Sequence, residues 1–275
     1  MAGIVDAAAA LAEKVVVIIG GTSGLGLSAT KACVRAGARV VAVGLPGQDA
    51  VLLEDTMLED GCVLATGDAR DPATAQSAVA RAVEKFGGFH ALYHVAGGSG
   101  LAHGDGPLDQ LSDDGWNFSV DLNLTTVFYS NRAAARQFLK QGNGGCVLNI
   151  SSVLAFSPSP AYFATHAYAA AKAGIIGMTK AAAAYYAPKN IRFNAICPAL
   201  VDTPMAARAA HDPEIRKYIA TKQPLDGGRI GQADDLDAAV VFLLSDAAKF
   251  VTGQVLSVDG GWCVSEGRNN PSAVS

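Results

Sequence analysis

The sequence is short of cysteine, and the cysteines it has stand far apart. Five occur among 275 residues and no two form a C-x-x-C pair, so the sequence indicates neither a disulfide framework nor a zinc site. Each lies in an apolar neighbourhood and is expected to be a small core residue: Cys33, Cys62, Cys146, Cys197 and Cys263.

Charges and long apolar runs are also scarce. Charged residues make up 17% of the chain, and its 21 basic and 25 acidic side chains are spread along it. Without a basic patch, nucleic acid is not expected as a partner. No window of about eighteen uncharged apolar residues occurs, and no basic residue precedes Lys14, so we expect neither a membrane span nor a signal peptide. These absences predict a cytoplasmic protein.

What remains is an apolar chain rich in glycine. Half of its residues are hydrophobic, and thirty glycines stand against eleven prolines without a three-residue period. This composition excludes disorder and collagen and indicates tight turns between regular elements. The length suits one large core, and the polar end is typical of a loose tail. We therefore expect one domain over residues 1–265 and a tail over 266–275.

Short β-branched runs alternate with helical patterns along the whole chain. The runs are almost wholly apolar, as strands are when helices cover both faces of a parallel sheet. They predict strands at residues 15–19, 39–43, 62–66, 90–95, 146–150, 191–196 and 255–258. Helices are expected near 24–36, 48–60, 72–86, 113–140, 160–187, 203–222 and 232–246. This order predicts an α/β fold, a single Rossmann-type doubly wound sheet of about seven parallel strands with helices on both faces.

A glycine-rich loop joins the first expected strand to the first expected helix. Its sequence over residues 20–26, Gly-Gly-Thr-Ser-Gly-Leu-Gly, allows positive φ angles and presents backbone N–H groups beside a helix N-terminus. These features favour a dinucleotide pyrophosphate, although the spacing is not G-x-G-x-x-G and a plain tight turn is the alternative. No G-x-x-x-x-G-K-[ST] motif occurs, which excludes an ATPase phosphate loop.

A tyrosine four residues before a lysine occurs three times. Residues at this spacing share one face of a helix, so a phenol and an ammonium can act together. One pair straddles a proline and another lies between two prolines, in a segment expected to form a mobile flap; these are Tyr185–Lys189 and Tyr218–Lys222. Tyr168 and Lys172 instead follow a buried strand that ends in serines at 151–152. This context selects Tyr168.

These features together resemble the short-chain dehydrogenase/reductase family in its common form of similar length, over residues 15–262. The matching pieces occur in the family's order: the glycine loop, Asp68, Ala96–Gly97, Asn123, Ser152, Tyr168, Lys172, 198–203, 251–254 and 258–261. The resemblance implies an NAD(P)-dependent oxidoreductase that interconverts a carbonyl and a secondary alcohol by hydride transfer.

The resemblance also implies roles for the reacting residues. Tyr168 would be the general acid when a carbonyl is reduced and the general base when an alcohol is oxidised. A free phenol titrates near about 10, so Lys172 and an oxidised nicotinamide are expected to lower its pKa. Lys172 would also hold the nicotinamide ribose, and Ser152 would donate to the substrate oxygen. Asn123 would hold a water that links Lys172 to solvent; the alternative is an asparagine that only satisfies backbone groups.

The cofactor contacts are implied in the same way. The pyrophosphate and the adjacent ribose would be surrounded by Gly20, Ser23, Gly24, Leu25 and Gly26. The adenine and its ribose would be lined by two pairs, Asp68–Ala69 and Ala96–Gly97. Val201 and Thr203 would hold the carboxamide, and Thr203 could also be the N-cap before a proline.

The sequence departs from the family pattern without losing a reacting group. The usual threonine of the glycine motif, the usual Asn-Asn pair and a usual glycine are replaced by Ile19, His94-Val95 and Ala199. His94 leaves the polar contacts around it open. The segment between Ser152 and Tyr168 is longer than is common and should lie over the substrate. It holds three specificity candidates, which could instead form only a wall of the loop: Tyr162, Phe163 and His166.

Two further patterns have simple explanations. A metal site needs at least three converging ligands, and none is expected from four that lie close in sequence, His90, His94, His103 and Asp105. The alanine-rich stretch 167–184 can be plain core. In the family this helix packs against its counterpart in another subunit, so the resemblance implies a homo-oligomer, a dimer or a homotetramer.

Two rival functions stay open. A catalytically silent dinucleotide-binding regulator would have lost the tyrosine or the lysine, and both are present. A Rossmann-like methyltransferase also uses a glycine-rich first turn but needs no such pair. Fold alone decides neither case. The small-molecule substrate is equally open between sugars, steroids, acyl thioesters and small ketones, because residues 97–110, 153–167 and 203–228 carry no recognisable code.

The choice between NAD and NADP depends on the end of the second strand. An NAD enzyme usually has a carboxylate there for the ribose hydroxyls, and Gly44 occupies that place. An NADP enzyme needs a cation nearby, and Leu45 and residues 22–23 supply none. A dianion without a cation costs more than two hydroxyls left to water, and Asp49 could reach those hydroxyls. NAD is therefore slightly favoured.

Overall fold

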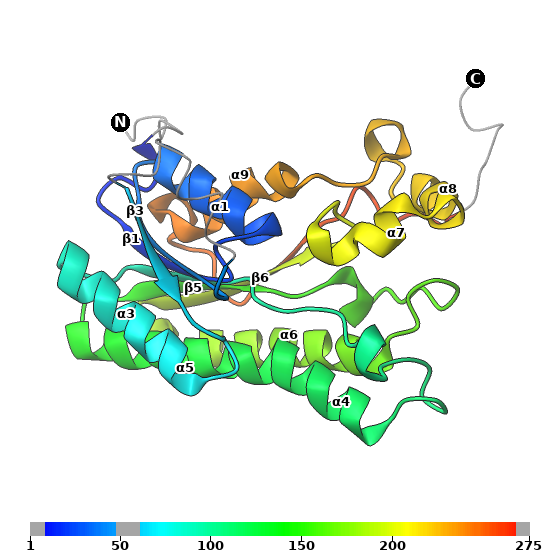
Figure 1. Ribbon diagram of the computed structural model, residues 1–275. Helices are drawn as coiled ribbons and strands as arrows, with labels where there is room; N and C mark the ends of the chain where they lie inside the picture. Colours follow the sequence, from blue (N-terminus) through cyan, green and yellow to red (C-terminus); the bar gives the residue numbers. More distant parts are fainter. Residues whose placement is uncertain (1–8, 48–60, 268–275) are drawn as a thin grey trace.

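The computed structural model describes residues 9–47 and 61–267. At its centre is a sheet of seven parallel strands in the order β3-β2-β1-β4-β5-β6-β7 (Figure 1). The strands are β1 (Val15–Ile19), β2 (Arg39–Gly44), β3 (Cys62–Thr66), β4 (Ala91–His94), β5 (Gly145–Ile150), β6 (Ile191–Pro198) and β7 (Val255–Val258). Each lies within two residues of a strand predicted from the sequence, so the predicted parallel α/β sheet is confirmed.

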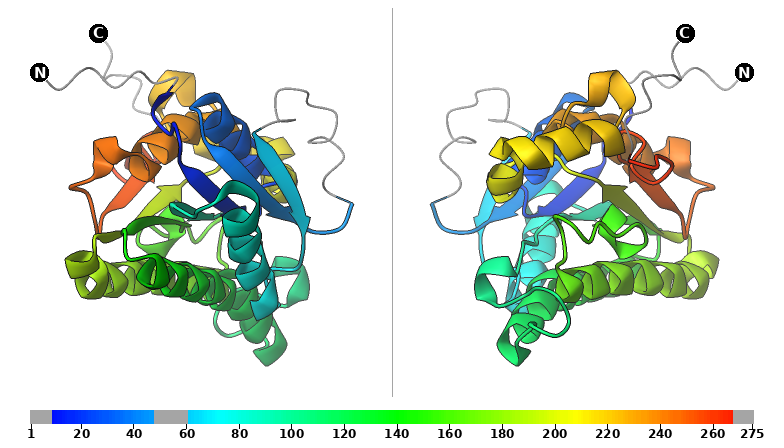
Figure 2. Two further views of the ribbon diagram at one scale, coloured as in Figure 1. Left: turned by 90° about the vertical axis from the view of Figure 1, so that its left-hand side faces the viewer. Right: turned by 90° about the vertical axis from the view of Figure 1, so that its right-hand side faces the viewer.

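Helices cover both faces of this sheet (Figures 1 and 2). One layer holds α3 (Pro72–Phe86), α4 (Asp113–Val120), α5 (Thr126–Gln141) and α6 (His166–Tyr186). The other layer holds α1 (Gly24–Arg35) and α9 (Asp237–Leu244), and on the same side lie α7 (Ala207–His211) and α8 (Pro213–Lys222). Alternation of strand and helix thus gives a doubly wound, single-domain Rossmann-type fold.

Alternate residues of each strand enter the two layers. In β1, Val16 and Ile18 belong to the core beneath α1 and α9, while Val15, Val17 and Ile19 belong to the core beneath α3 and α5. No residue of β1 is more than 3% exposed. Burial on both faces explains why the strand is an unbroken apolar run instead of an alternating one.

Several predicted helices have different bounds in the structure. α6 begins at His166, six residues later than predicted. The helix predicted over 203–222 is divided into α7 and α8, because the Asp212 side chain accepts hydrogen bonds from the first N–H groups of α8. The helix predicted over 232–246 is shortened to α9. The helix predicted near 48–60 lies outside the described residues.

The long helix predicted over 113–140 is present but is not regular. A π-helical turn, η4 (Asp121–Thr125), joins α4 to α5. Such turns widen a helix locally and are frequent at functional sites. The residues of η4, which include Asn123, are therefore candidates for a functional role.

The sheet has a switch point between β1 and β4. From β1 the chain runs outward to β2 and β3, then crosses to β4 and continues through β5 and β6 to β7. The loops after β1 and β4 therefore leave in opposite directions and open a crevice at the carboxyl ends of the strands, where ligands bind in such sheets. Both loops were selected from the sequence as cofactor contacts.

The cysteines and the membrane prediction can be compared with the structure directly. All five cysteines are free thiols, and Cys33, Cys146 and Cys197 are buried as predicted, while Cys62 and Cys263 are half-buried. Within residues 9–47 and 61–267, we find no helix with the length and apolar character needed to cross a bilayer.

Candidate active site

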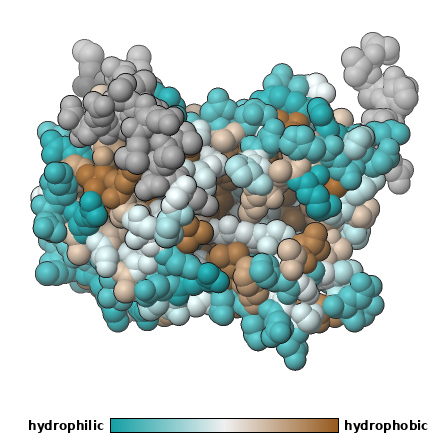
Figure 3. All heavy atoms as spheres, in the orientation of Figure 1, coloured by the Kyte–Doolittle hydropathy of each residue, from teal (hydrophilic) through white to brown (hydrophobic). Residues whose placement is uncertain are grey.

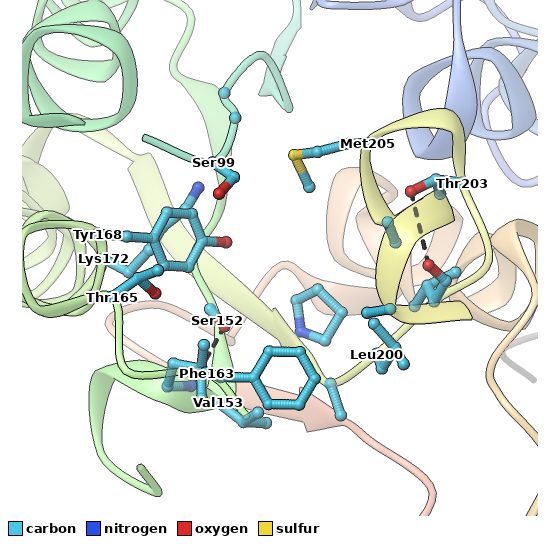
Figure 4. A pocket seen from close by; sticks show the side chains of 18 of the residues that line it. Ser99, Ser152, Val153, Phe163, Thr165, Tyr168, Lys172, Leu200, Thr203 and Met205 are labelled. Atoms are coloured by element: carbon cyan, nitrogen blue, oxygen red, sulfur yellow. Dashed lines mark hydrogen bonds between the residues drawn. The ribbon is translucent and has the colours of Figure 1, made fainter. Parts of the chain in front are cut away.

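A cavity of about 390 Å³ lies at the carboxyl ends of the central strands. Such a volume suits a small organic molecule. The segments that follow β4, β5 and β6 form its walls, together with the first turn of α6 and residues of α7. Figure 3 shows hydrophobic side chains around a hollow on this face of the molecule, and Figure 4 shows the cavity from close by.

Ser152 and Tyr168 enter the cavity from neighbouring elements. Ser152 follows β5 and is 7% exposed, and its Oγ accepts a hydrogen bond from Leu154 N at 3.2 Å. The serine proton therefore stays available for an acceptor in the cavity. Tyr168 lies in the first turn of α6, and its hydroxyl points into the cavity (Figure 4). Two hydroxyl groups can thus face one substrate oxygen.

Lys172 lies one helical turn after Tyr168 and on the same side of α6. Its side chain is 3% exposed, and its Nζ donates a hydrogen bond to Ile150 O at 3.3 Å. The Nζ atom is 5.4 Å from the centre of the Tyr168 ring. Burial lowers the pKa of Lys172 to about 8. The lysine is therefore anchored to the end of β5 beside the phenol.

The pKa of Tyr168 is raised in the protein alone. Burial raises the pKa of Tyr168 to about 12, and the Ser152 hydroxyl opposes this rise. The lowering expected from Lys172 together with an oxidised nicotinamide stays a prediction. A lowered pKa requires the further positive charge that an oxidised nicotinamide adds.

Asn123 lies in η4 and is fully buried. Its Nδ2 donates to Gly98 O and Ser119 O, both at 2.9 Å, and its Oδ1 accepts from Gly98 N at 3.1 Å. These bonds fasten the loop after β4 to the helix, as the alternative interpretation of Asn123 expected. A Cβ atom at Gly97 would lie 2.8 Å from Asn123 Oδ1 and 3.4 Å from Lys172 Nζ. The amide and the ammonium therefore approach the same glycine.

His94 makes polar contacts through both ring nitrogens. Its Nδ1 lies 2.7 Å from Ser130 Oγ, and its Nε2 lies 3.1 Å from Ala96 O and 3.3 Å from Thr126 Oγ1. Burial, together with the positive charge of Lys172, lowers the pKa of His94 to about 3. The ring is thus neutral near pH 7. Ser130 and Thr126 of α5 supply polar contacts for this histidine, which stands where the family usually has an asparagine.

The glycine loop after β1 is shaped for close packing and for an anion. A Cβ atom at Gly20 would lie 2.6 Å from Ala96 N, and one at Gly26 would lie 1.8 Å from Gly20 O. Ser23 precedes α1, and its side chain makes no capping hydrogen bond. The first N–H groups of α1 therefore stay available at a helix N-terminus, where a pyrophosphate binds. The loop fits the expected dinucleotide.

Thr22 occupies the space beside the end of β2. A Cβ atom at Gly44 would lie 1.8 Å from Thr22 Oγ1. Thr22 is 3% exposed, and its hydroxyl has no hydrogen-bond partner among the residues that the structure describes. Glycine at 44 is therefore a packing requirement, which explains why no carboxylate stands there. Asp49, the possible substitute, lies outside the described residues.

The other expected cofactor residues lie around the same strand ends. Asp68 forms an ion pair with Arg70 at 2.6 Å, and the hydrogen bonds from Arg70 lower the pKa of Asp68. Thr203 occupies the N-cap position before Pro204, as its alternative role expected, but its side chain makes no capping bond, and its Oγ1 instead donates to Val201 O at 3.5 Å (Figure 4). The expected cofactor residues that line the cavity are Leu25, Gly97, Tyr168, Lys172, Val201 and Thr203.

Two of the three specificity candidates line the cavity. Phe163 packs against Trp262 with ring centres 6.0 Å apart, and Tyr162 packs against Tyr218 at 5.1 Å. His166 is exposed and lies outside the lining, although its neighbours Thr165 and Tyr168 belong to it. The prediction that His166 contacts substrate is therefore wrong for this cavity.

The wall opposite Phe163 includes residues that the sequence did not reveal. Leu200 and Met205 face the cavity across from the aromatic ring (Figure 4). Arg208 and Trp262 also line it. Met205 lies in the segment 203–228, which carries no recognisable code for the substrate, so no local pattern identified its lining residues. Trp262 comes from far along the chain.

The two competing tyrosines have other surroundings. Tyr185 is 77% exposed and contacts the Tyr186 ring edge-on. Tyr218 packs edge-on against Trp262 with ring centres 6.0 Å apart. The expected flap is a packed helix, since Ile215 and Ile219 of α8 are buried in a cluster with Trp262. Of the tyrosines in the three pairs, Tyr168 is the one that lines the cavity.

The four potential metal ligands have other uses. His90 Nδ1 accepts a hydrogen bond from Val15 N at 3.0 Å, and the His103 ring stacks on Phe118 at 3.7 Å between centres. His94 is paired as above, and Asp105 binds backbone N–H groups of α6. Across the described ranges, we find no group of three His, Cys, Asp or Glu side chains that could hold a metal ion.

Comparison with known proteins gives matches over nearly the whole chain. A family model described as enoyl-(acyl carrier protein) reductase matches residues 20–263. The chain is 36% identical over 256 residues to the 2,5-dichloro-2,5-cyclohexadiene-1,4-diol dehydrogenase of Sphingobium indicum, covering 92% of this chain and 98% of that protein. It is 35% identical over 258 residues to the L-rhamnose 1-dehydrogenase (NAD(P)(+)) of Azotobacter vinelandii, covering 91% and 97%.

A solved structure agrees with these matches. A short-chain type dehydrogenase/reductase from Mycobacterium ulcerans has a TM-score of 0.84 at 31% identity, with 94% of this chain and 93% of that chain covered. The two curated relatives are dehydrogenases that act on alcohol groups. The matches therefore support neither a silent regulator nor a methyltransferase. The protein is an NAD(P)-dependent oxidoreductase that acts on alcohol groups of small molecules, and the chain belongs to the short-chain dehydrogenase/reductase family.

Proposed function

We propose that the enzyme interconverts a cyclic secondary alcohol and its ketone, with Tyr168 as general acid and base. The observation that carries this proposal is that Ser152, Tyr168 and Lys172 open into one cavity whose other walls are mainly apolar. In oxidation Tyr168 takes the hydroxyl proton, and in reduction it returns that proton to the oxygen. The nicotinamide, when bound, accepts or supplies the hydride.

The neighbouring residues support the proton transfer. Ser152 donates a hydrogen bond to the substrate oxygen and stabilises its developing negative charge. Lys172 favours the phenolate through its positive charge and binds the nicotinamide ribose. Asn123 fastens the loop that carries Gly97 and Gly98, and its Oδ1 is placed to hold a water beside Lys172. That water would return the proton to solvent.

We propose the same cofactor contacts that the resemblance implied. The glycine loop and the free N–H groups of α1 hold the pyrophosphate. The Asp68–Ala69 and Ala96–Gly97 pairs lie on the adenosine side, and Val201 and Thr203 hold the carboxamide. These assignments rest on the fit of the glycine loop and on the shared strand ends.

The cavity favours a ring-shaped, largely apolar substrate. Phe163, Leu200 and Met205 offer broad hydrophobic contacts to the two faces of a ring. Lys172 and Arg208 are the charged side chains of the lining in the described part of the chain. A cationic substrate is therefore disfavoured. One relative acts, by its name, on a cyclohexadiene diol, which supports the same substrate class.

A screen for cofactor reduction tests this function. We expect cyclic secondary alcohols, such as substituted cyclohexanols, to be oxidised with kcat/KM at least ten-fold above straight-chain polyols of similar size. A clear preference for straight-chain polyols or for acyl thioesters would contradict the substrate class. Reduction of an enoyl thioester without any reaction of alcohols would contradict the proposed chemistry itself.

We propose NAD as the preferred cofactor. No cation stands near Thr22 and Gly44 in the described part of the loop and strand, and a phosphate dianion brought there would be unpaired. We expect kcat/KM for NAD to exceed that for NADP by about three-fold to thirty-fold, the equivalent of about 0.7–2 kcal/mol. Parallel kinetics with both cofactors measure this, and a ten-fold preference for NADP would mean that a basic group reaches the pocket.

The quaternary state and location are proposals as well. α6 exposes small residues four positions apart, Ala173, Gly177 and Ala181, on the side away from its buried face. Close approach of a second copy of this helix would bury that surface, so we propose a homo-oligomer, a dimer or a tetramer. The cytoplasmic location stays a prediction.

A further inference from the structure

We propose that Asp105 is a positioning residue for Tyr168: its carboxylate holds the first turn of α6 and thereby sets the place of the phenol in the cavity. The proposal rests on the proposed role of Tyr168. It adds a residue that lies 63 positions earlier in the sequence, in the loop after β4.

The first turn of α6 depends on groups outside the helix. A helix leaves its first N–H groups without intrahelical acceptors, and Thr165, at the N-cap position, makes no side-chain capping bond. Asp105 supplies what Thr165 does not. Its Oδ1 accepts from Ala167 N at 3.0 Å, and its Oδ2 accepts from Tyr168 N at 2.9 Å. The adjoining Gly106 O accepts from His166 N at 3.2 Å.

Asp105 is itself held firmly. It is 4% exposed, and its Oδ2 also accepts a hydrogen bond from Ser119 Oγ at 3.1 Å. A Cβ atom at Gly100 would lie 1.9 Å from Ser119 Oγ and 3.1 Å from Asp105 Cβ. The glycine is therefore needed for the carboxylate and the serine to meet. A buried carboxylate at a helix N-terminus also interacts favourably with the helix dipole.

The same contacts link Tyr168 to the other site residues. Ser119, which donates to Asp105, accepts through its backbone oxygen from Asn123 Nδ2 at 2.9 Å. A continuous chain of hydrogen bonds thus runs from Tyr168 N through Asp105 and Ser119 to Asn123. The loop after β4, the helix that carries η4 and the start of α6 are therefore fixed relative to one another by one side chain.

Lys172 does not depend on this contact. Ser151 Oγ donates to Lys172 O at 2.8 Å, and Lys172 Nζ donates to Ile150 O. The lysine is anchored to β5, one turn beyond the part of α6 that Asp105 holds. Loss of the carboxylate should therefore displace the phenol relative to Ser152 and Lys172, while the lysine and the glycine loop keep their places.

The test is the variant Asp105→Ala, with Asp109→Ala as the matched control. Asp109 is an exposed aspartate of the same loop. We expect Asp105→Ala to lower kcat per NADH-binding site at least thirty-fold, with the number of sites, the NADH Kd and the substrate KM each within three-fold of wild type. Hydrogen exchange at the amides of Ala167 and Tyr168 should become at least ten-fold faster. Asp109→Ala should resemble wild type in every measurement.

A second variant guards against loss of folding. Asp105→Asn keeps one amide oxygen for the helix but turns an NH2 group toward the other N–H, so we expect a loss of kcat between those of wild type and Asp105→Ala. If the total activity of Asp105→Ala falls only in proportion to its number of NADH-binding sites, the positioning role is contradicted. Faster exchange with an unchanged kcat per site would also contradict it. If wild type oxidises no alcohol, the proposed function fails; unchanged exchange in Asp105→Ala contradicts the role of Asp105 alone.

Discussion

Replacing Tyr168 by phenylalanine is expected to lower kcat by about 10³-fold, within the range that a positioned general acid or base supplies. The substitution removes the hydroxyl that points into the cavity and leaves the ring in place. Because the glycine loop and α1 are untouched, the Kd of NADH should stay within three-fold of wild type. Steady-state kinetics and fluorescence titration of NADH measure the two quantities.

The chain supplies its own controls for this variant. Tyr185→Phe and Tyr218→Phe remove the hydroxyls of the other two tyrosine–lysine pairs, one exposed at the end of α6 and one packed against Trp262. Both variants should keep kcat within about three-fold of wild type. An active Tyr168→Phe variant beside an inactive Tyr185→Phe variant would mean that the active site has been placed on the wrong pair.

The second large effect is expected for Lys172→Met. Burial raises the pKa of Tyr168, and the Lys172 ammonium, 5.4 Å from the centre of the Tyr168 ring, is expected to favour the phenolate. Without it the pKa of Tyr168 rises further. Below that pKa, each unit of rise reduces the phenolate fraction ten-fold. We therefore expect alcohol oxidation at pH 7 to fall by about 10²-fold, which corresponds to about two units.

The pH profile of oxidation separates this effect from simple damage. In wild type the rate should rise with pH as Tyr168 loses its proton, and it should level off as pH passes about 8, where Lys172 begins to lose the charge that favours the phenolate. In Lys172→Met the rate should keep rising to higher pH. Lys180→Met, an exposed position on the same helix, should keep the wild-type profile. A Lys172→Met profile parallel to that of wild type would contradict this role.

The strands were predictable from the sequence because each is buried on both faces. The run Val15–Ile19 leads directly into the glycine loop, and its predicted bounds agree with the structure. The proposed reacting groups could be selected from the sequence for a related reason: Ser152, Tyr168 and Lys172 are placed by the end of β5 and by the spacing of one helical turn, and both are local features.

The errors arise where distant residues decide the local structure. The start of α6 could not be read from the alanine-rich sequence around it, because its cap comes from Asp105. The raised pKa of Tyr168 depends on burial by several elements at once, and Trp262 joins the lining only because the chain returns after β7.

The contact between Thr22 and Gly44 restricts the order in which cofactor preference can be changed by mutation. An acidic or basic residue introduced at 44 collides with a stiff β-branched side chain whose Oγ1 would lie 1.8 Å from the new Cβ. Replacing Thr22 by glycine first removes that obstacle, whereas alanine would leave a Cβ atom 2.7 Å from the new one; either change also removes a buried hydroxyl without a described partner. Either substitution tried alone therefore gives a misleading answer about the other. A library that varies the two positions together, or a lineage that passes through glycine at 22, avoids this collision, whereas single-site selection at 44 meets a steric barrier that has nothing to do with the cofactor.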